Sequence, residues 1–388
     1  MKNKFIDFEK KGLLITVILL CTFLSLGLNL NVGGWWWTDE SRHAMDGVFF
    51  LDFYKDWPVF NAYNYAVEYF IHYPALGFAW YPPFFAIIES VFFLVFGISE
   101  FTARLTVFVF CLVGMITWYC WAEKKWGRIN SFFACLFFLF NPYVILWGQA
   151  VMLEIPGISM IFLSILCTEL YMKRQSYLNA TFLGLALLAM LLTKQVTVFI
   201  IPVLFLYLFL SNKLNILILK QSLVTYVLVI FACIFLVIHA LKFGSTALGG
   251  INESMSAVDG VIRNFKITLR AIWISYSFPF KLLILSSVLS FFYKKPDKND
   301  YFILIWIICW IVFFSLISSK LGNTLRYTIY LTPIIGMFSM RFFCIVNNRK
   351  LRLLSFISLM ILYASYAYTG ILNKANYVNG YKEVANYI

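Results

Sequence analysis

The chain has few charged residues, and acidic ones are especially scarce. Charged side chains make up 13% of its 388 residues, whereas 62% of the residues are hydrophobic and 20% are aromatic. Soluble domains carry about 25% charged residues. Together with a mean hydropathy of +0.83, this deficit excludes an ordinary soluble protein and indicates a chain that crosses a lipid bilayer several times.

The shortage of acids leaves a formal net charge of +13. In a soluble protein such an excess would suggest a nucleic-acid partner. Here the basic residues lie mainly in short segments between apolar runs, which is the pattern that orients membrane helices. The expected partner is therefore the lipid bilayer and not a nucleic acid.

Motifs for nucleotide chemistry are missing as well. The sequence contains no P-loop, no G-x-G-x-x-G after a predicted strand and no internal repeat. The short basic segments also leave no room for a nucleotide-binding domain. A reaction that uses ATP or a nucleotide sugar on the cytoplasmic side is therefore not expected.

Metal ligands are sparse. The eight cysteines lie in or beside apolar runs without C-x-x-C spacing, so we read them as small buried hydrophobes. The chain has only three histidines. His72 follows Glu68 by four residues, and His239 ends an apolar run, so a divalent metal ion on either one with an acid stays open as a weak alternative. No metal site is otherwise predicted, and no cofactor is certain.

Apolar runs of membrane-spanning length recur along the chain, and in lipid such runs must be helices. The first follows a basic flank but lacks a small-residue cleavage site, so we expect a retained helix and not a cleaved signal peptide. We predict about eleven spans, with 177–193 and 196–211 forming a tight hairpin or one broken helix. Their cores are 13–30, 104–121, 130–147, 155–172, 177–193, 196–211, 222–241, 279–293, 301–318, 326–343 and 352–370.

One further apolar run, Pro82 to Gly97, decides the orientation. It is short, begins with Pro-Pro and contains Glu89. If it lies in the membrane interface, nearly all basic loop residues fall on one side, which the positive-inside rule assigns to the cytoplasm. The prediction is a multi-pass cell-membrane protein whose N-terminus is cytoplasmic.

The fold expected from this orientation is an all-α polytopic membrane protein with interfacial helices in a large first loop. Residues 1–370 would form the transmembrane domain. The loops 31–103 and 243–275 and the tail 371–388 would then form one extracytoplasmic face.

An acidic pair, Asp39-Glu40, follows the first span directly. Thr38 is predicted to cap a helix that runs to about Lys55, with the acids in its first turn and Arg42 one turn later. The acids could simply complement the helix dipole. A carboxylate at the membrane surface is also suited to accept a proton from a hydroxyl group.

Three more charged residues lie at predicted outer ends of spans. Glu154 precedes Pro156 at a helix start, Lys194 follows Thr193, and Arg326 precedes Tyr327. Each could be an ordinary end charge. Together, a lysine and an arginine fork could bind a phosphate. The run Trp35 to Trp37 is typical of an interfacial aromatic belt, although such rings also stack on sugars.

The order of these features resembles the GT-C superfamily of membrane glycosyltransferases. Asp39-Glu40 is followed by Tyr81-Pro82-Pro83 and by Phe96-Gly97-Ile98-Ser99-Glu100-Phe101-Thr102-Ala103-Arg104-Leu105. The motifs continue with Asn141-Pro142, Glu154, Thr193-Lys194 and Arg326-Tyr327 followed by Pro333. The likeness covers roughly residues 12 to 345. Within the superfamily, the chain looks most like the branch that contains the protein O-mannosyltransferases and the lipid A aminoarabinose transferase.

The resemblance implies transfer of a sugar from a polyprenyl-phosphate donor to a lipid, glycan or protein acceptor on the extracytoplasmic side, typically with inversion. By that likeness Asp39 would be the general base, with Glu40 beside it. Glu154 would help to position the acceptor, the base or a metal, and Lys194 and Arg326 would stabilise the leaving phosphate. Arg42, Tyr81 and Tyr327 are further candidates for binding the substrate.

The chain departs from the family pattern in two places. Many members carry a lysine where this chain has Tyr81, and many continue into a soluble outer domain after the last span. A secondary transporter or lipid flippase is the main alternative function. Transporters usually place ionisable residues near the bilayer midplane within repeated halves, whereas the charged candidates here lie at one predicted face.

Overall fold

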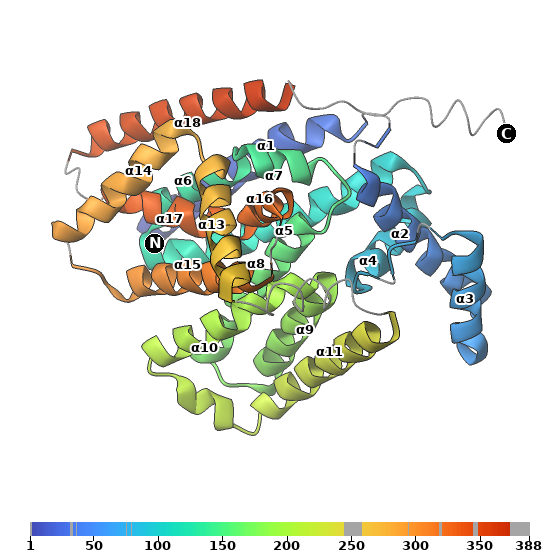
Figure 1. Cartoon of the computed structure of the whole chain (residues 1–388). Coiled ribbons are helices and arrows are strands. Elements are labelled where there is room, and N and C mark those ends of the chain that lie inside the picture. Colours follow the sequence, from blue (N-terminus) through green and yellow to red (C-terminus); the bar gives the residue numbers. More distant parts are fainter. Residues whose placement is uncertain are drawn as a thin grey trace.

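The computed structural model describes residues 2–31, 34–35, 37–74, 76–78, 80–243, 258–293, 295–317, 320–343 and 348–372. Throughout these ranges the regular secondary structure is helical (Figure 1), which confirms the all-α prediction. The tail beyond residue 372, the segment 244–257 and Cys344 lie outside the described residues, while the seven described cysteines are free thiols.

Two long helices form the centre of the fold. α5 (Glu100–Trp126) packs against α8 (Glu154–Lys173), and α8 is buried along most of its length. Gly114 of α5 allows this contact, because a Cβ atom there would lie 2.4 Å from the Ser159 Oγ. Close approach through small residues is how helices pack in lipid, where burial of apolar side chains gives little driving force.

The remaining helices surround this pair. α9 (Tyr177–Thr193) packs on α8, and α11 (Ser222–Phe243) packs on α9 with its other side largely exposed, as expected for a lipid-facing helix. α10 (Ile200–Leu210) packs on α15 (Lys298–Ile317), and α17 (Thr332–Phe343) packs on α6 (Arg128–Leu139). The other helices are α1 (Lys2–Leu26), α7 (Pro142–Gly148), α13 (Val258–Ser275), α14 (Phe278–Leu289), α16 (Leu321–Tyr327) and α18 (Arg349–Leu372).

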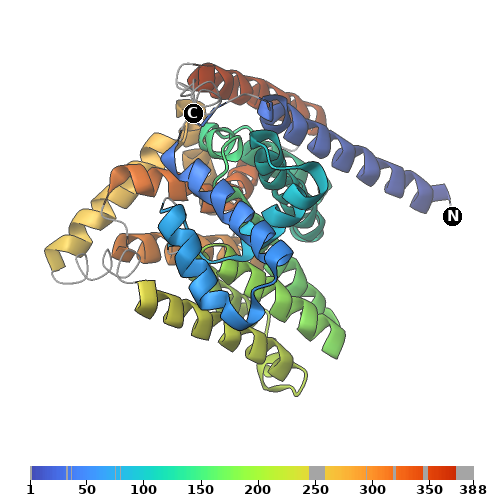
Figure 2. The same cartoon turned by 90° about the vertical axis from the view of Figure 1, so that its right-hand side faces the viewer.

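The predicted first loop forms a helical layer at one side of the molecule (Figures 1 and 2). It contains α2 (Thr38–Asp56), α3 (Ala62–His72) and α4 (Phe84–Phe96). Its two ends meet, because the Gly34 amide donates to the Glu100 carboxylate over 3.0 Å and the Arg104 guanidinium donates to the Gly34 carbonyl. The whole layer is thus anchored on the start of α5.

The short apolar run after Pro-Pro is α4. With 13 residues it is only about 20 Å long, whereas the hydrocarbon core of a bilayer is about 30 Å thick. α4 packs against α2 and α5. Its length agrees with the predicted interfacial placement.

Judged by helix length, fewer helices qualify as membrane spans than the eleven predicted. Among the described residues, five helices are long and apolar enough to cross a membrane, or up to seven if each bent pair is one span. The run 130–147 bends by 62° between α6 and α7, where Pro142 lacks an amide and Asn141 caps the new helix by accepting from the amides of Tyr143 and Val144. The count of eleven stays a prediction.

Three local features differ from or refine the sequence analysis. Trp37 and not Thr38 occupies the capping position of α2, and the Glu40 carboxylate accepts from the Trp37 amide. Between α9 and α10, Lys194 is extended and is followed by a short 3-10 helix, so the two predicted spans are separate pieces. The region 243–275, expected as a loop, contains the 18-residue helix α13.

Candidate functional site

Glu154 lies at the centre of a buried cluster of charges. It is the first residue of α8, and its side chain is fully buried. One carboxylate oxygen, Oε1, pairs with the Lys194 ammonium and lies 2.9 Å from the Arg326 Nε. The second oxygen, Oε2, has no hydrogen-bond partner among the described residues. One oxygen of this carboxylate therefore lies against two cations, while the other is buried without a hydrogen bond in the described residues.

Lys194 reaches Glu154 because α8 and α9 run in opposite directions. Lys194 is the first residue after α9, so the end of α9 lies beside the start of α8. The backbone of Lys194 is extended, so the chain no longer follows the axis of α9 at this residue. Burial lowers the pKa of Lys194 to about 8, and the Glu154 carboxylate opposes this shift. The ammonium is therefore mostly protonated at neutral pH but loses its proton under mildly alkaline conditions.

Asp39 lies at the more accessible edge of the cluster. It occupies the first turn of α2, and its side chain is 18% exposed. Its Oδ2 lies 3.4 Å from the Arg326 Nη1, and its Oδ1 lies 3.8 Å from the Arg42 Nη1. Arg326, at the end of α16, thus connects the carboxylates of Asp39 and Glu154, and it contacts Asp39 over the longer distance.

The second acid of the predicted pair has a different environment. Glu40 is fully buried, and its two oxygens accept hydrogen bonds from the backbone amides of Trp37 (3.2 Å) and Val151 (3.0 Å). Val151 precedes α8 by three residues. Glu40 therefore joins the start of α2 to the start of α8, which sets Asp39 beside Glu154.

Aromatic rings line the cluster. The Arg326 guanidinium lies over the rings of Trp147 (5.8 Å) and Tyr327 (5.5 Å), and the Lys194 ammonium also lies over Tyr327 (5.5 Å). Trp37 packs edge-on against Trp147. These rings shield the cations from solvent without neutralising them. Trp147 carries no charge and belongs to no family motif, so sequence reasoning did not find it.

Tyr81 and His43 complete the cluster. Tyr81, from the Pro-Pro loop, packs edge-on against His43 with ring centroids 4.6 Å apart. Burial first, and then the Asp39 carboxylate, raises the pKa of the Tyr81 phenol. Burial and the cations Lys194, Arg326 and Arg42 lower the pKa of His43 to about 3. Both side chains are therefore uncharged at neutral pH. His43 was missed as a site residue, although its spacing of four residues after Asp39 places it on the same face of α2.

The proposed metal ligands do not join the cluster. His72 is exposed on α3 and its Nδ1 lies 2.8 Å from the Glu68 carbonyl, while the His239 Nε2 lies 2.6 Å from the Phe78 carbonyl. Nowhere in the described ranges do three His, Cys, Asp or Glu side chains gather as a metal site. The residues present do not fit a bound divalent ion, so we derive no step through one.

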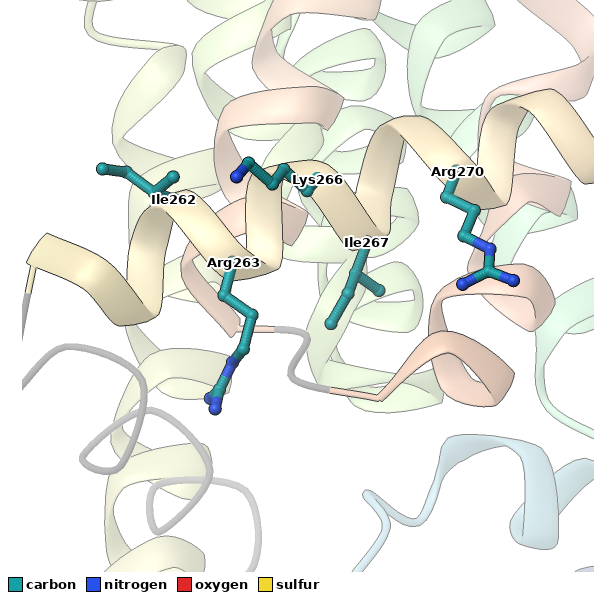
Figure 3. Close-up of a pocket in the computed structure, with 5 residues that line it drawn as sticks. All are labelled: Ile262, Arg263, Lys266, Ile267 and Arg270. Atoms are coloured by element: carbon teal, nitrogen blue, oxygen red, sulfur yellow. The ribbon is translucent and has the colours of Figure 1, made fainter.

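A second cationic surface lies on α13, which packs against α16, the helix that carries Arg326. A shallow hollow of about 400 Å³ lies along α13 (Figure 3). In the figure Arg263, Ile267 and Arg270 point to the same side of the helix. The hollow is lined by Ile262, Arg263, Lys266, Ile267 and Arg270. A second group of cations is thus next to the helix that supplies Arg326.

Comparisons with known proteins give a partial family match and a similar fold. Residues 81–239 match the family model described as dolichyl-phosphate-mannose-protein mannosyltransferase. No curated protein matches the chain in sequence. The fold is similar to the crystal structure of ArnT from Cupriavidus metallidurans bound to undecaprenyl phosphate, with a TM-score of 0.64 and 19% identity over 91% of this chain and 63% of ArnT.

The structure of the same ArnT in the apo state is also similar. Its TM-score is 0.54 and its identity is 18%, over 87% of this chain and 60% of ArnT. This chain therefore spans less than two thirds of the length of ArnT.

Proposed function

Because this chain has the GT-C fold of membrane glycosyltransferases, as its motifs predicted, we propose that it transfers a sugar from a polyprenyl-phosphate donor to an acceptor hydroxyl. The observation that carries this proposal is the convergence of Asp39, Glu154, Lys194 and Arg326 from four separate elements. A hydroxyl nucleophile needs a base, and a phosphate leaving group needs cations. The cluster holds both.

The mechanism we propose is a single displacement. Asp39 takes the proton of the acceptor hydroxyl while the hydroxyl oxygen forms a bond to the anomeric carbon of the sugar. The bond from that carbon to the phosphate oxygen breaks, and its electron pair stays on the phosphate. Because the acceptor attacks the face opposite to the leaving group, the configuration at that carbon inverts.

The cations would stabilise the charge that develops on the phosphate. Lys194 and Arg326 together with Arg42 outnumber the carboxylates of Asp39 and Glu154 by one, and His43 adds no charge. These three cations are complementary to a lipid phosphate. The cationic surface of α13 beside α16 extends the same complementarity.

Arg326 would couple binding of the donor to activation of the base. The contact of Arg326 with Asp39 is the longer of its two ion pairs, and the anionic phosphodiester of the donor would compete for the same guanidinium. Once Arg326 turns to the phosphate, the Asp39 carboxylate loses one of its two ion-pair partners. The Oδ2 of Asp39 is then available to the acceptor hydroxyl when donor is present.

The positions of the charges also favour an enzyme over a transporter or flippase. Asp39 and Glu154 lie in first helical turns, Lys194 directly follows a helix, and Arg326 lies in a last turn. Transporters usually place such groups along broken helices near the membrane centre.

Asp39→Asn tests the proposal in protein reconstituted into nanodiscs. The donors are polyprenyl-phosphate mannose and polyprenyl-phosphate aminoarabinose, and the readout is release of polyprenyl phosphate. We expect a loss of about 10²–10⁴-fold, the usual contribution of a general base. Binding of undecaprenyl phosphate should be retained or strengthened, because Arg326 is released. Lys194→Ala and Arg326→Ala should instead weaken that binding.

Asp52→Asn is the matched control. Asp52 lies on the same helix, where it accepts from the Tyr69 hydroxyl and lies outside the cluster, so its variant should react like the unmodified chain. A folded Asp39→Asn protein that retains transfer would remove Asp39 from the role of base. Absence of donor consumption by the unmodified chain with both donors and with its copurifying lipids would contradict the proposed activity.

A further inference from the structure

A cavity of about 200 Å³ lies between α8, α9, α10 and α11. Its lining residues on α8, Thr168 and Tyr171, follow Glu154 by 14 and 17 positions. At a rise of about 1.5 Å per residue, the cavity is roughly 20–25 Å from the charged cluster. It therefore lies well away from the candidate site, toward the other end of α8.

The walls of the cavity offer hydrocarbon and no unpaired polar group. Thr168 donates to the Ser164 carbonyl and Thr225 to the Ala180 carbonyl. The remaining hydroxyls are also bonded within the protein: Tyr171 with Ser222, Ser222 with the Ile216 carbonyl, and Tyr226 with the Leu217 carbonyl. The other lining side chains are apolar. Because these hydroxyl donors are already used within the protein and the rest of the wall is apolar, the cavity favours an apolar occupant.

The cavity is accessible from the lipid-facing surface. Two of its lining residues, Phe205 of α10 and Tyr226 of α11, are 50% and 36% exposed. A cavity of about 150 Å³ with apolar walls already accepts a small hydrocarbon. Part of an acyl chain therefore fits, whereas a whole lipid does not, so the rest of the lipid must lie outside.

Positive charge lies next to this opening. The segment Leu214–Ile218 contributes Ile216 and Leu217 to the wall, and it is flanked by Lys213 and Lys220. Both lysines are exposed, and neither ammonium forms an ion pair within the described part of the chain. Such lysines beside a crevice between helices are suited to bind lipid phosphate.

We propose that this cavity binds one acyl chain of an anionic glycerophospholipid whose phosphate lies on Lys213 and Lys220. The apolar chain gains little from leaving the bilayer, because lipid tails are as apolar as the cavity wall. It gains contacts with walls that would otherwise lack partner atoms. The selectivity for an anionic lipid comes from the two lysines.

The site also has a structural consequence for the cluster of charges. Leu183 and Leu187 of α9 face the cavity from one side, and Ile201 and Leu204 of α10 from the other. Lys194 is in the connection between these two helices. A bound chain would therefore fill the space between the helices on either side of Lys194 and stabilise their arrangement.

Native mass spectrometry of the whole purified protein tests the proposal, with phosphatidylglycerol and phosphatidylcholine as probes. We expect phosphatidylglycerol to bind the unmodified chain at least tenfold more tightly. The double variant Lys213→Gln and Lys220→Gln should lose roughly 10- to 30-fold in affinity for phosphatidylglycerol, since each lysine near a lipid surface contributes about fivefold. The control Lys295→Gln and Lys298→Gln removes two exposed lysines elsewhere and should bind normally.

Leu187→Phe gives an independent check, because the larger ring fills the cavity without changing charge. It should lower retention of phosphatidylglycerol in a folded protein. Equal binding of both lipids, normal binding by the lysine double variant or normal binding by Leu187→Phe would each overturn the proposal. None of these measurements depends on sugar transfer, so the proposed function stands or falls separately.

Discussion

Replacing Glu154 with glutamine is the sharpest test of the charged cluster. The Glu154 side chain is fully buried, and those of Lys194 and Arg326 are only 3% and 9% exposed. Glu154→Gln leaves two buried cations facing a neutral amide. Removing one partner of a buried ion pair typically costs about 3–5 kcal/mol, so we expect the free energy of unfolding to fall by that amount.

The reciprocal change should cost less, because the cluster is asymmetric. Lys194→Met leaves Glu154 still paired with Arg326 at 2.9 Å, so the expected cost is about 1–3 kcal/mol, that of a lost hydrogen-bond partner. In the double variant Glu154→Gln and Lys194→Met, the cation whose ion pair Glu154→Gln removes is gone, while Arg326 keeps its contact with Asp39. Its cost should therefore be smaller than the sum of the two single costs, by about 0.5–3 kcal/mol.

Unfolding in detergent micelles by titration with sodium dodecyl sulfate, followed by circular dichroism at neutral pH, measures all three variants. Glu68→Gln, which removes an exposed acid on α3, is the control and should change stability by less than about 0.5 kcal/mol. The reasoning is refuted if Lys194→Met costs as much as Glu154→Gln. A Glu154→Gln protein as stable as the unmodified chain would refute it too.

Three further outcomes follow from the same geometry. If Lys194 must be protonated to stabilise the phosphate, the initial rate of transfer should decline as pH rises through about 8. In Lys194→Arg this decline should move to higher pH. A decline at the same pH in both proteins would exclude Lys194 as the group whose deprotonation stops transfer. Glu40→Ala leaves the Val151 amide without its acceptor and should lower the free energy of unfolding by about 1–3 kcal/mol. It should also lower the rate of transfer with little change in the binding of undecaprenyl phosphate. Normal transfer by this variant would contradict the role of Glu40 in positioning Asp39 beside Glu154. Glu89 is fully buried with neither carboxylate oxygen hydrogen-bonded in the described residues. Glu89→Met should therefore leave stability unchanged or higher, because burial of an unpaired carboxyl group is unfavourable. A clear loss of stability in the same titration would mean that Glu89 has a partner.

Much of the molecule could be predicted from local properties of the sequence. Scarcity of charge and long apolar runs require helices in a bilayer, because lipid offers the backbone no hydrogen-bond partners. The break at Asn141-Pro142 follows from the missing amide of proline. Asp39, Glu154 and Lys194 could be recognised because an isolated charge at the end of an apolar helix is uncommon enough to stand out.

Other features depended on contacts between residues distant in sequence. Asp39 and Arg326 are 287 residues apart, and only helix packing makes Arg326 a bridge between Asp39 and Glu154. Glu40 looks like a second reactive acid in the sequence, but its oxygens bind backbone amides from two segments. The neutral state of His43 likewise depends on burial and on cations from other helices.

The sequence by itself therefore determined which residues carry charge at helix ends and that the helices lie in lipid, because these properties are set within about twenty consecutive residues. Only the tertiary structure decided which charges share a partner, which acid is held by backbone amides and where a cavity remains between helices. Burial and ion pairing are properties of neighbours in space, and the order of residues along one helix does not specify those neighbours.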